Sequence, residues 1–192
     1  MSVPADIRDL EDQLDKVDQD AGALVAGLTE ARGAWRQNPE SWSVAECLDH
    51  LATGNRVYLQ AMAEPAARAR REGRRRTGPA LPGLVGRWFV RWLEPPVNPR
   101  LKGKAPQTIE PRASPPLADA YASFTASQDE VRAFLRAHAD LDLASVRFPN
   151  PFIRGVRFSL ATGLHVIPAH ERRHLWQAWR VRRAAEQAAT EL

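Results

Sequence analysis

Apolar side chains in the N-terminal part of the chain recur at alternating spacings of three and four residues. This spacing places them on one face of an α-helix, with acidic and polar residues on the opposite face. The apolar stripe consists of Ile7, Leu10, Leu14, Val17, Ala21, Leu24, Leu28 and Ala31, and Trp35 follows in register. The pattern predicts one long amphipathic helix over residues 7–31, which ends before Pro39.

A second helix is predicted to begin at Ser43. Ser43 is followed three residues later by Glu46, the spacing of a capping box, and Trp42 stands where it can pack on the first turn. The apolar face of this helix consists of Cys47, Leu51, Gly54, Tyr58 and Met62, and it also carries His50. We expect regular structure to end near Pro65, because proline removes a backbone donor.

Residues 65–116 are rich in proline and arginine and predict a long crossover between helices. A short helix is expected within it at residues 84–93. The Arg-rich part, residues 68–76, is expected to be a solvated arm that contains the glycine at position 73.

Two more long helices are predicted in the C-terminal half. The third covers Leu117 to His138, and the fourth runs from about Ser159 to Gln187, with a kink at Pro168. No segment shows the alternation of a β-strand. The sequence therefore predicts an all-α four-helix bundle, formed by a single domain over residues 1–192.

Composition narrows the class of protein. The 192 residues include one cysteine, Cys47, which excludes an internal disulfide framework and a cysteine-rich zinc module. No apolar run is long enough for a transmembrane helix, and the first residues lack the pattern of a signal peptide, so we expect a cytoplasmic protein.

Positive charge is concentrated in one segment. Between Arg68 and Lys104, basic residues exceed acidic ones by nine, whereas the whole chain has a formal net charge of +4. The rest of the chain is therefore acidic, which disfavours nucleic acid as a partner of the whole protein.

Histidines are the strongest candidates for chemistry. His170 and His174 are one helical turn apart, a spacing that suits two bonds to one metal ion. His50 lies on the inward face of another helix and can supply a third nitrogen. Nitrogen ligands suit a divalent ion such as Zn²⁺ or Ni²⁺. The alternative is that the three are ordinary polar residues on partly buried faces.

The segment from His170 to His174 also matches the H-E-x-x-H pattern of zinc proteases, in which Glu171 would be the general base. Such a protease needs an edge strand and a third, usually downstream, ligand. We predict no strand, and few residues follow His174. We therefore expect Glu171 to support a ligand or to lie at the surface.

The chain resembles a known family through two motifs, Trp42-Ser-Val-Ala-Glu-Cys-Leu-Asp-His50-Leu51 and Ala169-His-Glu-Arg-Arg-His174-Leu-Trp-Gln177. Both are similar to those of the DinB/YfiT-like superfamily, metal-binding four-helix bundles that include bacillithiol- and mycothiol-dependent transferases. The resemblance covers the whole chain in element order. It implies metal ligation by His50, His170 and His174. It also implies an up-down-down-up bundle, in which the long crossover connects two parallel helices.

Four further residues have simpler interpretations. Cys47 is expected to be a small core residue rather than a reactive thiol. His138 ends the third helix, where a cation suits the helix dipole. His165 falls off the histidine face, and Gln177 can orient a ligand or satisfy a buried backbone group.

Arginines alternate with aromatic residues in the short segment Arg87-Trp-Phe-Val-Arg-Trp92. Such a segment can lie on an anionic membrane or stack on single-stranded nucleic acid. We favour a helix that covers the open end of the bundle with its arginines solvated, because so short a helix offers little apolar area.

These observations leave three functions open. The first is a metal-dependent thiol S-transferase, with a low-molecular-weight thiol as co-substrate and a small electrophilic molecule as substrate; the Arg-rich crossover would hold an anionic co-substrate. The second is a non-catalytic metal-binding bundle, or one that acts as a homodimer. The third is a surface-binding module built on the basic crossover.

Overall fold

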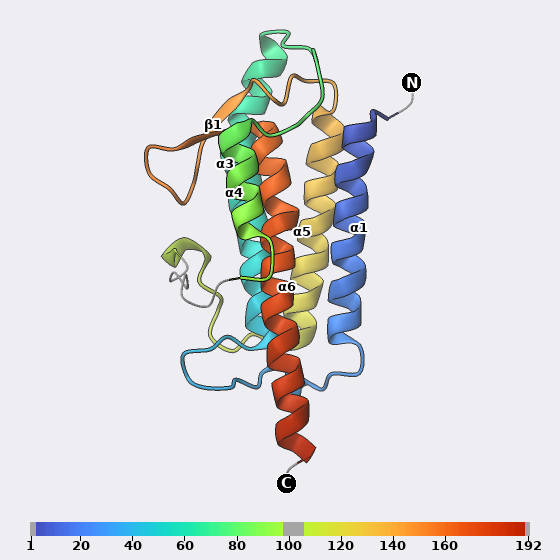
Figure 1. Cartoon of the computed structure of the whole chain (residues 1–192), viewed down its shortest axis with the longest axis vertical. Coiled ribbons are helices and arrows are strands. Elements are labelled where there is room, and N and C mark those ends of the chain that lie inside the picture. The colour runs from blue at the N-terminus through green and yellow to red at the C-terminus, as the bar shows by residue number, and fades with distance from the viewer. Residues whose placement is uncertain (1–2, 98–105, 191–192) are drawn as a thin grey trace.

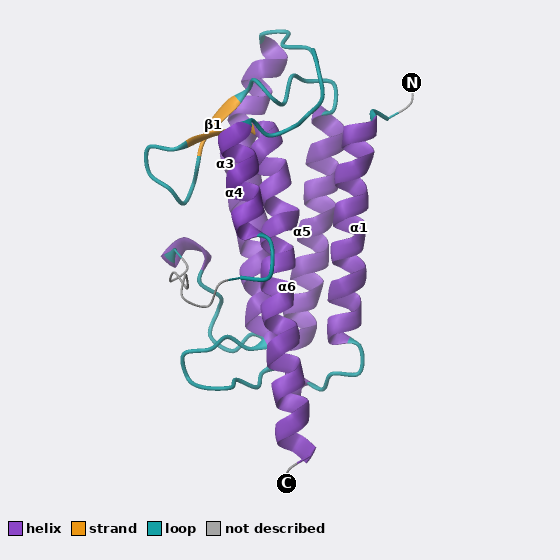
Figure 2. Ribbon diagram, viewed as in Figure 1, coloured by secondary structure: helices purple, strands orange, loops and turns teal. Residues whose placement is uncertain are grey.

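A computed structural model describes residues 3–97 and 106–190 of the chain. Figure 2 shows that helices make up most of it, with one short hairpin of strands. In chain order the elements are α1 (Ala5–Val25), α2 (Glu30–Gly33), α3 (Val44–Arg71), α4 (Leu84–Leu93), the 3₁₀ helix η2 (Gln107–Ile109), α5 (Leu117–His138), β1 (Arg147–Pro149), β2 (Arg157–Ser159) and α6 (Leu160–Thr190). The predicted all-α class is confirmed. No described helix has the length and hydropathy needed to cross a membrane.

The four long helices lie side by side (Figure 1). α3 packs on α5 and α6, and α1 packs on α6 and α5. α1 and α6 run in one direction and α3 and α5 in the other (Figure 1). Since α3 and α5 are parallel, the chain between them must return along the bundle, and the segment that contains α4 makes this return.

The first helix is shorter than its apolar stripe suggests. Its first six stripe positions are all buried, as expected: Ile7, Leu10, Leu14, Val17, Ala21 and Leu24. However, α1 ends at Val25, and Gly27 has a positive φ of 73° that reverses the chain. Ala31 falls on the separate helix α2, which Thr29 caps, and it is exposed. The prediction of one helix through Ala31 is therefore wrong.

The start of α3 is as predicted and its end is not. The Ser43 hydroxyl accepts from the Glu46 N–H at 3.1 Å, and the Glu46 carboxylate accepts from the Ser43 N–H at 2.9 Å. The helix then continues past Pro65 to Arg71. Pro65 is buried, as are Ala66 and Ala69 in the next turns, so packing of this apolar end outweighs the loss of one backbone hydrogen bond.

The Arg-rich segment forms the last turn of α3 and the chain just after it, and it is attached to the bundle, so the expectation of a solvated arm over residues 68–76 is wrong. Arg70 bonds Asp140 at 2.9 Å, and Arg75 pairs with the same carboxylate. Arg76 reaches Asp6 on α1 at 2.5 Å. Acidic partners from distant parts of the sequence hold this segment, and local composition does not reveal them. Residues 98–104, the end of the basic stretch, lie outside the described residues.

From α4 onward, the observed elements agree with those predicted from the sequence except at one point. α4 and α5 have the predicted bounds, and α6 contains Pro168. Between α5 and α6, β1 and β2 form an antiparallel hairpin in which Phe148 faces Phe158. The expectation of no strand is therefore wrong. Each strand has only three residues, too few for alternation to be recognised.

We expect Leu14→Asp to destabilise the fold by about 3 kcal/mol or more, because it places an unpaired charge in the core. Leu14 is 1 % exposed. Gln19→Asp, at an exposed position of the same helix, is the matched control and should leave the free energy of unfolding nearly unchanged. Urea denaturation measures both. An unchanged midpoint for Leu14→Asp would show that α1 is not part of the core.

The Asp6–Arg76 pair makes stability depend on pH. Partial burial opposes ionisation of Asp6, but hydrogen bonds from Arg76 and the Ala80 N–H outweigh it and lower its pKa. The stabilisation is thus present above the unfolded pKa of about 3.9 and is lost as pH falls through the lower folded pKa. Asp6→Asn should cost about 1 kcal/mol at pH 7 and nothing in strong acid. A pH-independent difference between the two unfolding curves would contradict this.

Candidate metal centre

His50 is positioned by the start of α3. The capping box fixes the first turn, and His50 follows within two turns on the face that packs against α6. Its side chain is 1 % exposed. The Nδ1–H donates to the Ile109 carbonyl of η2 at 2.6 Å. The proton is therefore on Nδ1, and the lone pair of Nε2 points toward α6.

The other two histidines come from one face of α6, as predicted from their spacing. His170 Nε2 lies 3.2 Å from His50 Nε2. The ring centroid of His174 is 4.6 Å from that of His170 and 4.5 Å from that of His50. One ring nitrogen from each residue lies within 4.8 Å of the others. The structure thus brings together all three candidate ligands named from the sequence.

Neighbouring side chains orient the rings. The His174 Nδ1–H donates to Gln177 Oε1 at 3.1 Å, which leaves its Nε2 unprotonated. Trp42 packs on His50 and His174 with ring centroids 4.6 and 5.7 Å away. Gly54, one turn after His50, lies against His170: a Cβ there would make an ordinary van der Waals contact, 3.5 Å from its Cε1. Of the two roles that the sequence left open for Gln177, its hydrogen bond with His174 favours the orientation of a histidine.

A salt bridge attaches the crossover to the histidine cluster. Asp49, next to His50, accepts from the Arg112 backbone N–H and from its Nε, both at 2.8 Å. This contact holds residues 107–112 against α3, where the Ile109 carbonyl meets His50. Asp49, Ile109 and Arg112 were not among the residues predicted from the sequence to support the site. Only the position of Asp49 beside His50 could have suggested a supporting residue. The Ile109 carbonyl, more than fifty residues from His50 in the sequence, leaves no recognisable sequence pattern.

Burial keeps the imidazoles neutral. It lowers the pKa of His50. It also lowers the pKa of His170 to about 3, with help from the positive charge of Arg173 and from the charge that His50 would carry if it were protonated. The same causes lower the pKa of His174 well below its usual value. Neutral imidazole is the form that binds metal, so the cluster can hold an ion at neutral pH.

Glu171 is fully buried, which corrects the expectation that it could lie at the surface. Its Oε1 accepts from Asn55 Nδ2 at 2.8 Å, and Asn55 also bonds Ser127 of α5. Burial raises the pKa of Glu171 to about 7, although the hydrogen bond from Asn55 opposes this. Glu171 thus belongs to a polar contact among α3, α5 and α6 and is not one of the three clustered ligands.

The remaining candidates have structural roles. Cys47 is fully buried in the core, as expected, and burial raises the pKa of its thiol. The His138 Nδ1 bonds the Phe134 carbonyl at 2.8 Å near the end of α5. His165 lies off the cluster, as predicted, and its Nε2 bonds the Ala80 carbonyl at 3.1 Å.

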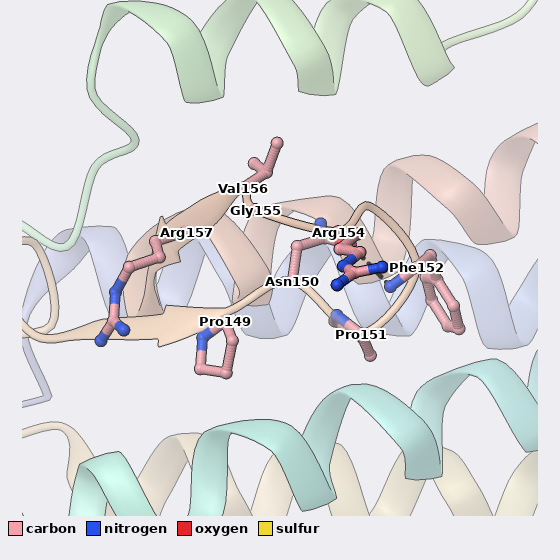
Figure 3. Close-up of a pocket in the computed structure, with 8 residues that line it drawn as sticks. All are labelled: Pro149, Asn150, Pro151, Phe152, Arg154, Gly155, Val156 and Arg157. Atoms are coloured by element: carbon pink, nitrogen blue, oxygen red, sulfur yellow. Dashed lines mark hydrogen bonds between the residues drawn. The ribbon is translucent and has the colours of Figure 1, made fainter.

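A separate depression of about 560 Å³ lies in the loop between β1 and β2. Figure 3 shows its lining, which includes Asn150, Phe152 and Arg154. None of the three clustered histidines lines it. The convergence of ligands, rather than the size of a depression, therefore identifies the candidate site.

Comparison with known families agrees with the geometry. The model of the DinB superfamily matches residues 13–178, which include the complete histidine cluster. The chain belongs to the DinB superfamily. No match was found among curated proteins, and none among solved structures. The description of the histidine cluster in this DinB protein therefore rests on its own structure and not on that of a relative.

We expect Asp49→Ala to release residues 107–112 from α3, because it removes the acceptor of the Arg112 amide and guanidinium. Hydrogen–deuterium exchange should become faster at the Arg112 amide and its neighbours. Asp119→Ala is the matched control, since Asp119 is an exposed acid near Arg112 that accepts none of these bonds. Equal exchange in the two variants would mean that Asp49 does not hold the crossover.

Proposed function

We propose that this DinB protein binds one divalent metal ion through His50, His170 and His174 and acts as a metal-dependent thiol S-transferase. The co-substrate is a low-molecular-weight thiol, and the acceptor is a small electrophilic molecule. The observation that carries the proposal is the convergence of three neutral imidazoles from two helices.

One pair of donors already has the spacing that a divalent ion requires. Two nitrogens bound about 2.1 Å from a tetrahedral ion lie about 3.4 Å apart. His50 Nε2 and His170 Nε2 are separated by 3.2 Å. Three nitrogen ligands leave at least one coordination position for water or substrate, and they favour Zn²⁺ or Ni²⁺.

The chain's own residues prepare the site for this chemistry. Ile109 and Gln177 accept the Nδ1 protons of His50 and His174, so the unprotonated nitrogens of these two rings face the cluster. Trp42 packs against one side of the cluster through its contacts with His50 and His174. A divalent ion bound there lowers the pKa of a coordinated thiol and so supplies a nucleophile at neutral pH.

Recognition of an anionic thiol is best assigned to Arg173. This residue lies between the two α6 histidines in sequence, and its positive charge contributes to the lowered pKa of both. Arg70, Arg75 and Arg76 of the crossover are already paired with carboxylates. We therefore move the role of binding an anionic co-substrate from the crossover to Arg173.

The remaining expectations belong to the same proposal. We infer one DinB-like domain over residues 1–192, with an up-down-down-up order of its four long helices and a cytoplasmic location. The opposite directions of the α1–α6 and α3–α5 pairs support this order (Figure 1). A non-catalytic, metal-binding or dimeric bundle is the alternative, and the kinetic test below distinguishes it.

We expect His170→Ala to lose the metal while its circular dichroism stays near that of the wild type. Untagged protein is loaded with Zn²⁺ or Ni²⁺, passed through gel filtration and analysed for metal. His138→Ala, which alters a histidine outside the cluster, and Glu171→Gln should each retain one ion per chain. Wild-type protein that retains no metal would show that the site does not exist.

We expect thiol transfer by the metal-loaded protein to depend on Arg173. Product formation is followed with a carboxylate-bearing thiol and a small electrophile. Arg173→Gln should raise the KM for this thiol about tenfold at unchanged metal content, because a charge-assisted contact is lost. An uncharged thiol is the control substrate and should show no change. A metal-loaded wild type without transfer activity would favour the non-catalytic bundle.

A further inference from the structure

Helix α4 presents an exposed apolar stripe. Leu84, Val85, Trp88 and Trp92 are 77, 73, 66 and 43 % exposed. Their spacing places all four on one side of the helix. The opposite side, with Gly86 and Leu93, is buried. α4 is thus apolar on two sides, and only one of them packs on the rest of the chain.

The inner side holds α4 firmly against α6 and the adjoining strand β2. A Cβ on Gly86 would lie 2.5 Å from Thr162 Oγ1, so the two helices approach closely there. Phe89 packs on Phe158 with ring centroids 5.1 Å apart. At the edge of the exposed stripe, the guanidinium of Arg173 on α6 lies 5.2 Å from the ring centre of Trp92. The exposed stripe is therefore displayed by a helix that is already formed and fixed in place.

Basic residues border the stripe. Arg87 and Arg91 are exposed on α4, which contains no acidic residue, and they take part in no ion pair within the described part of the chain. Beyond the end of α4, Arg180 and Arg183 line a depression with Pro95 and Trp176.

The acidic groups beside this surface are already engaged. Glu94 pairs with Arg172, and Asp20 accepts from the Trp179 indole at 2.8 Å. The free charge around the stripe is thus positive.

We propose that the exposed stripe of α4 docks this protein on an anionic lipid surface. Aliphatic side chains at Leu84 and Val85 enter the acyl boundary, Trp88 and Trp92 lie at the level of the headgroups, and the arginines contact lipid phosphates and carboxylates. The helix lies in the plane of the membrane surface and does not cross it.

Two other occupants suit this surface less well. A second copy related by a twofold axis would bring Arg87 and Arg91 toward their own copies, with no acid on α4 to compensate. Single-stranded nucleic acid stacks on aromatic rings, but the two most exposed residues of the stripe, Leu84 and Val85, have no ring. Aliphatic, indole and basic groups together favour a lipid surface.

Co-sedimentation of the full chain with vesicles tests the proposal. We expect binding to phosphatidylcholine vesicles that contain phosphatidylserine, binding about tenfold weaker to phosphatidylcholine alone, and weakening by salt. Val85→Asp and the pair Arg87→Glu/Arg91→Glu should each weaken binding about tenfold. Leu84→Asp repeats the apolar test at the most exposed position of the stripe.

Matched controls separate this surface from general effects of charge. Ile153→Asp alters an apolar residue of the hairpin loop that is 39 % exposed, and Arg8→Glu/Lys16→Glu on α1 changes the net charge by the same amount as the α4 pair. Both should retain wild-type binding.

Equal binding to both vesicle types, or unchanged binding of the Val85→Asp and Leu84→Asp variants, would overturn the proposal. So would conversion of a dimer to a monomer by Val85→Asp. Tighter binding to a single-stranded oligonucleotide than to the vesicles, insensitive to Val85→Asp, would equally overturn it.

Discussion

The packing of α3 against α6 determines the geometry of the candidate site. His50 approaches from α3 and His170 and His174 from α6, so a small rotation of either helix would separate the three rings. Contacts on both sides of the cluster prevent that rotation. The capping box fixes the start of α3, and the buried hydrogen bond of 2.8 Å between Asn55 and Glu171, the residue that follows His170, joins the two helices next to the histidines. Because the same packing desolvates the imidazoles, it also keeps them neutral.

This dependence explains why the ligands of the site were predictable and their supports were not. Helical periodicity places His170 and His174 on one face and His50 on the inward stripe of the second helix, so local pattern identifies all three as candidate ligands. The Ile109 carbonyl and the Asp49–Arg112 pair depend on how the crossover folds back on α3. No local pattern encodes a contact between residues so far apart in the sequence.

In the fold as well, features encoded by local sequence were predictable and features that depend on long-range contacts were not. The capping box at Ser43 and the bounds of α4 and α5 follow from short-range chemistry, and the structure agrees with them. The errors lie where long-range packing outweighs a local signal. Burial of its last turns carries α3 through Pro65, and distant carboxylates draw the arginines of the crossover onto the bundle. At the end of α1 the error is different, because the stripe continues past the turn at Gly27 without a break in its periodicity.

X-ray absorption at the zinc edge of the Zn²⁺-loaded protein tests the central claim most directly, because it reports the ligand atoms themselves. The account predicts three imidazole nitrogens at about 2.0 Å and no sulfur in the absence of added thiol. Removal of His50 by substitution with alanine should lower the imidazole count by one. A sulfur ligand, which only Cys47 or a methionine could supply, or a shell of oxygen atoms alone would contradict the assignment of His50, His170 and His174 as the metal ligands.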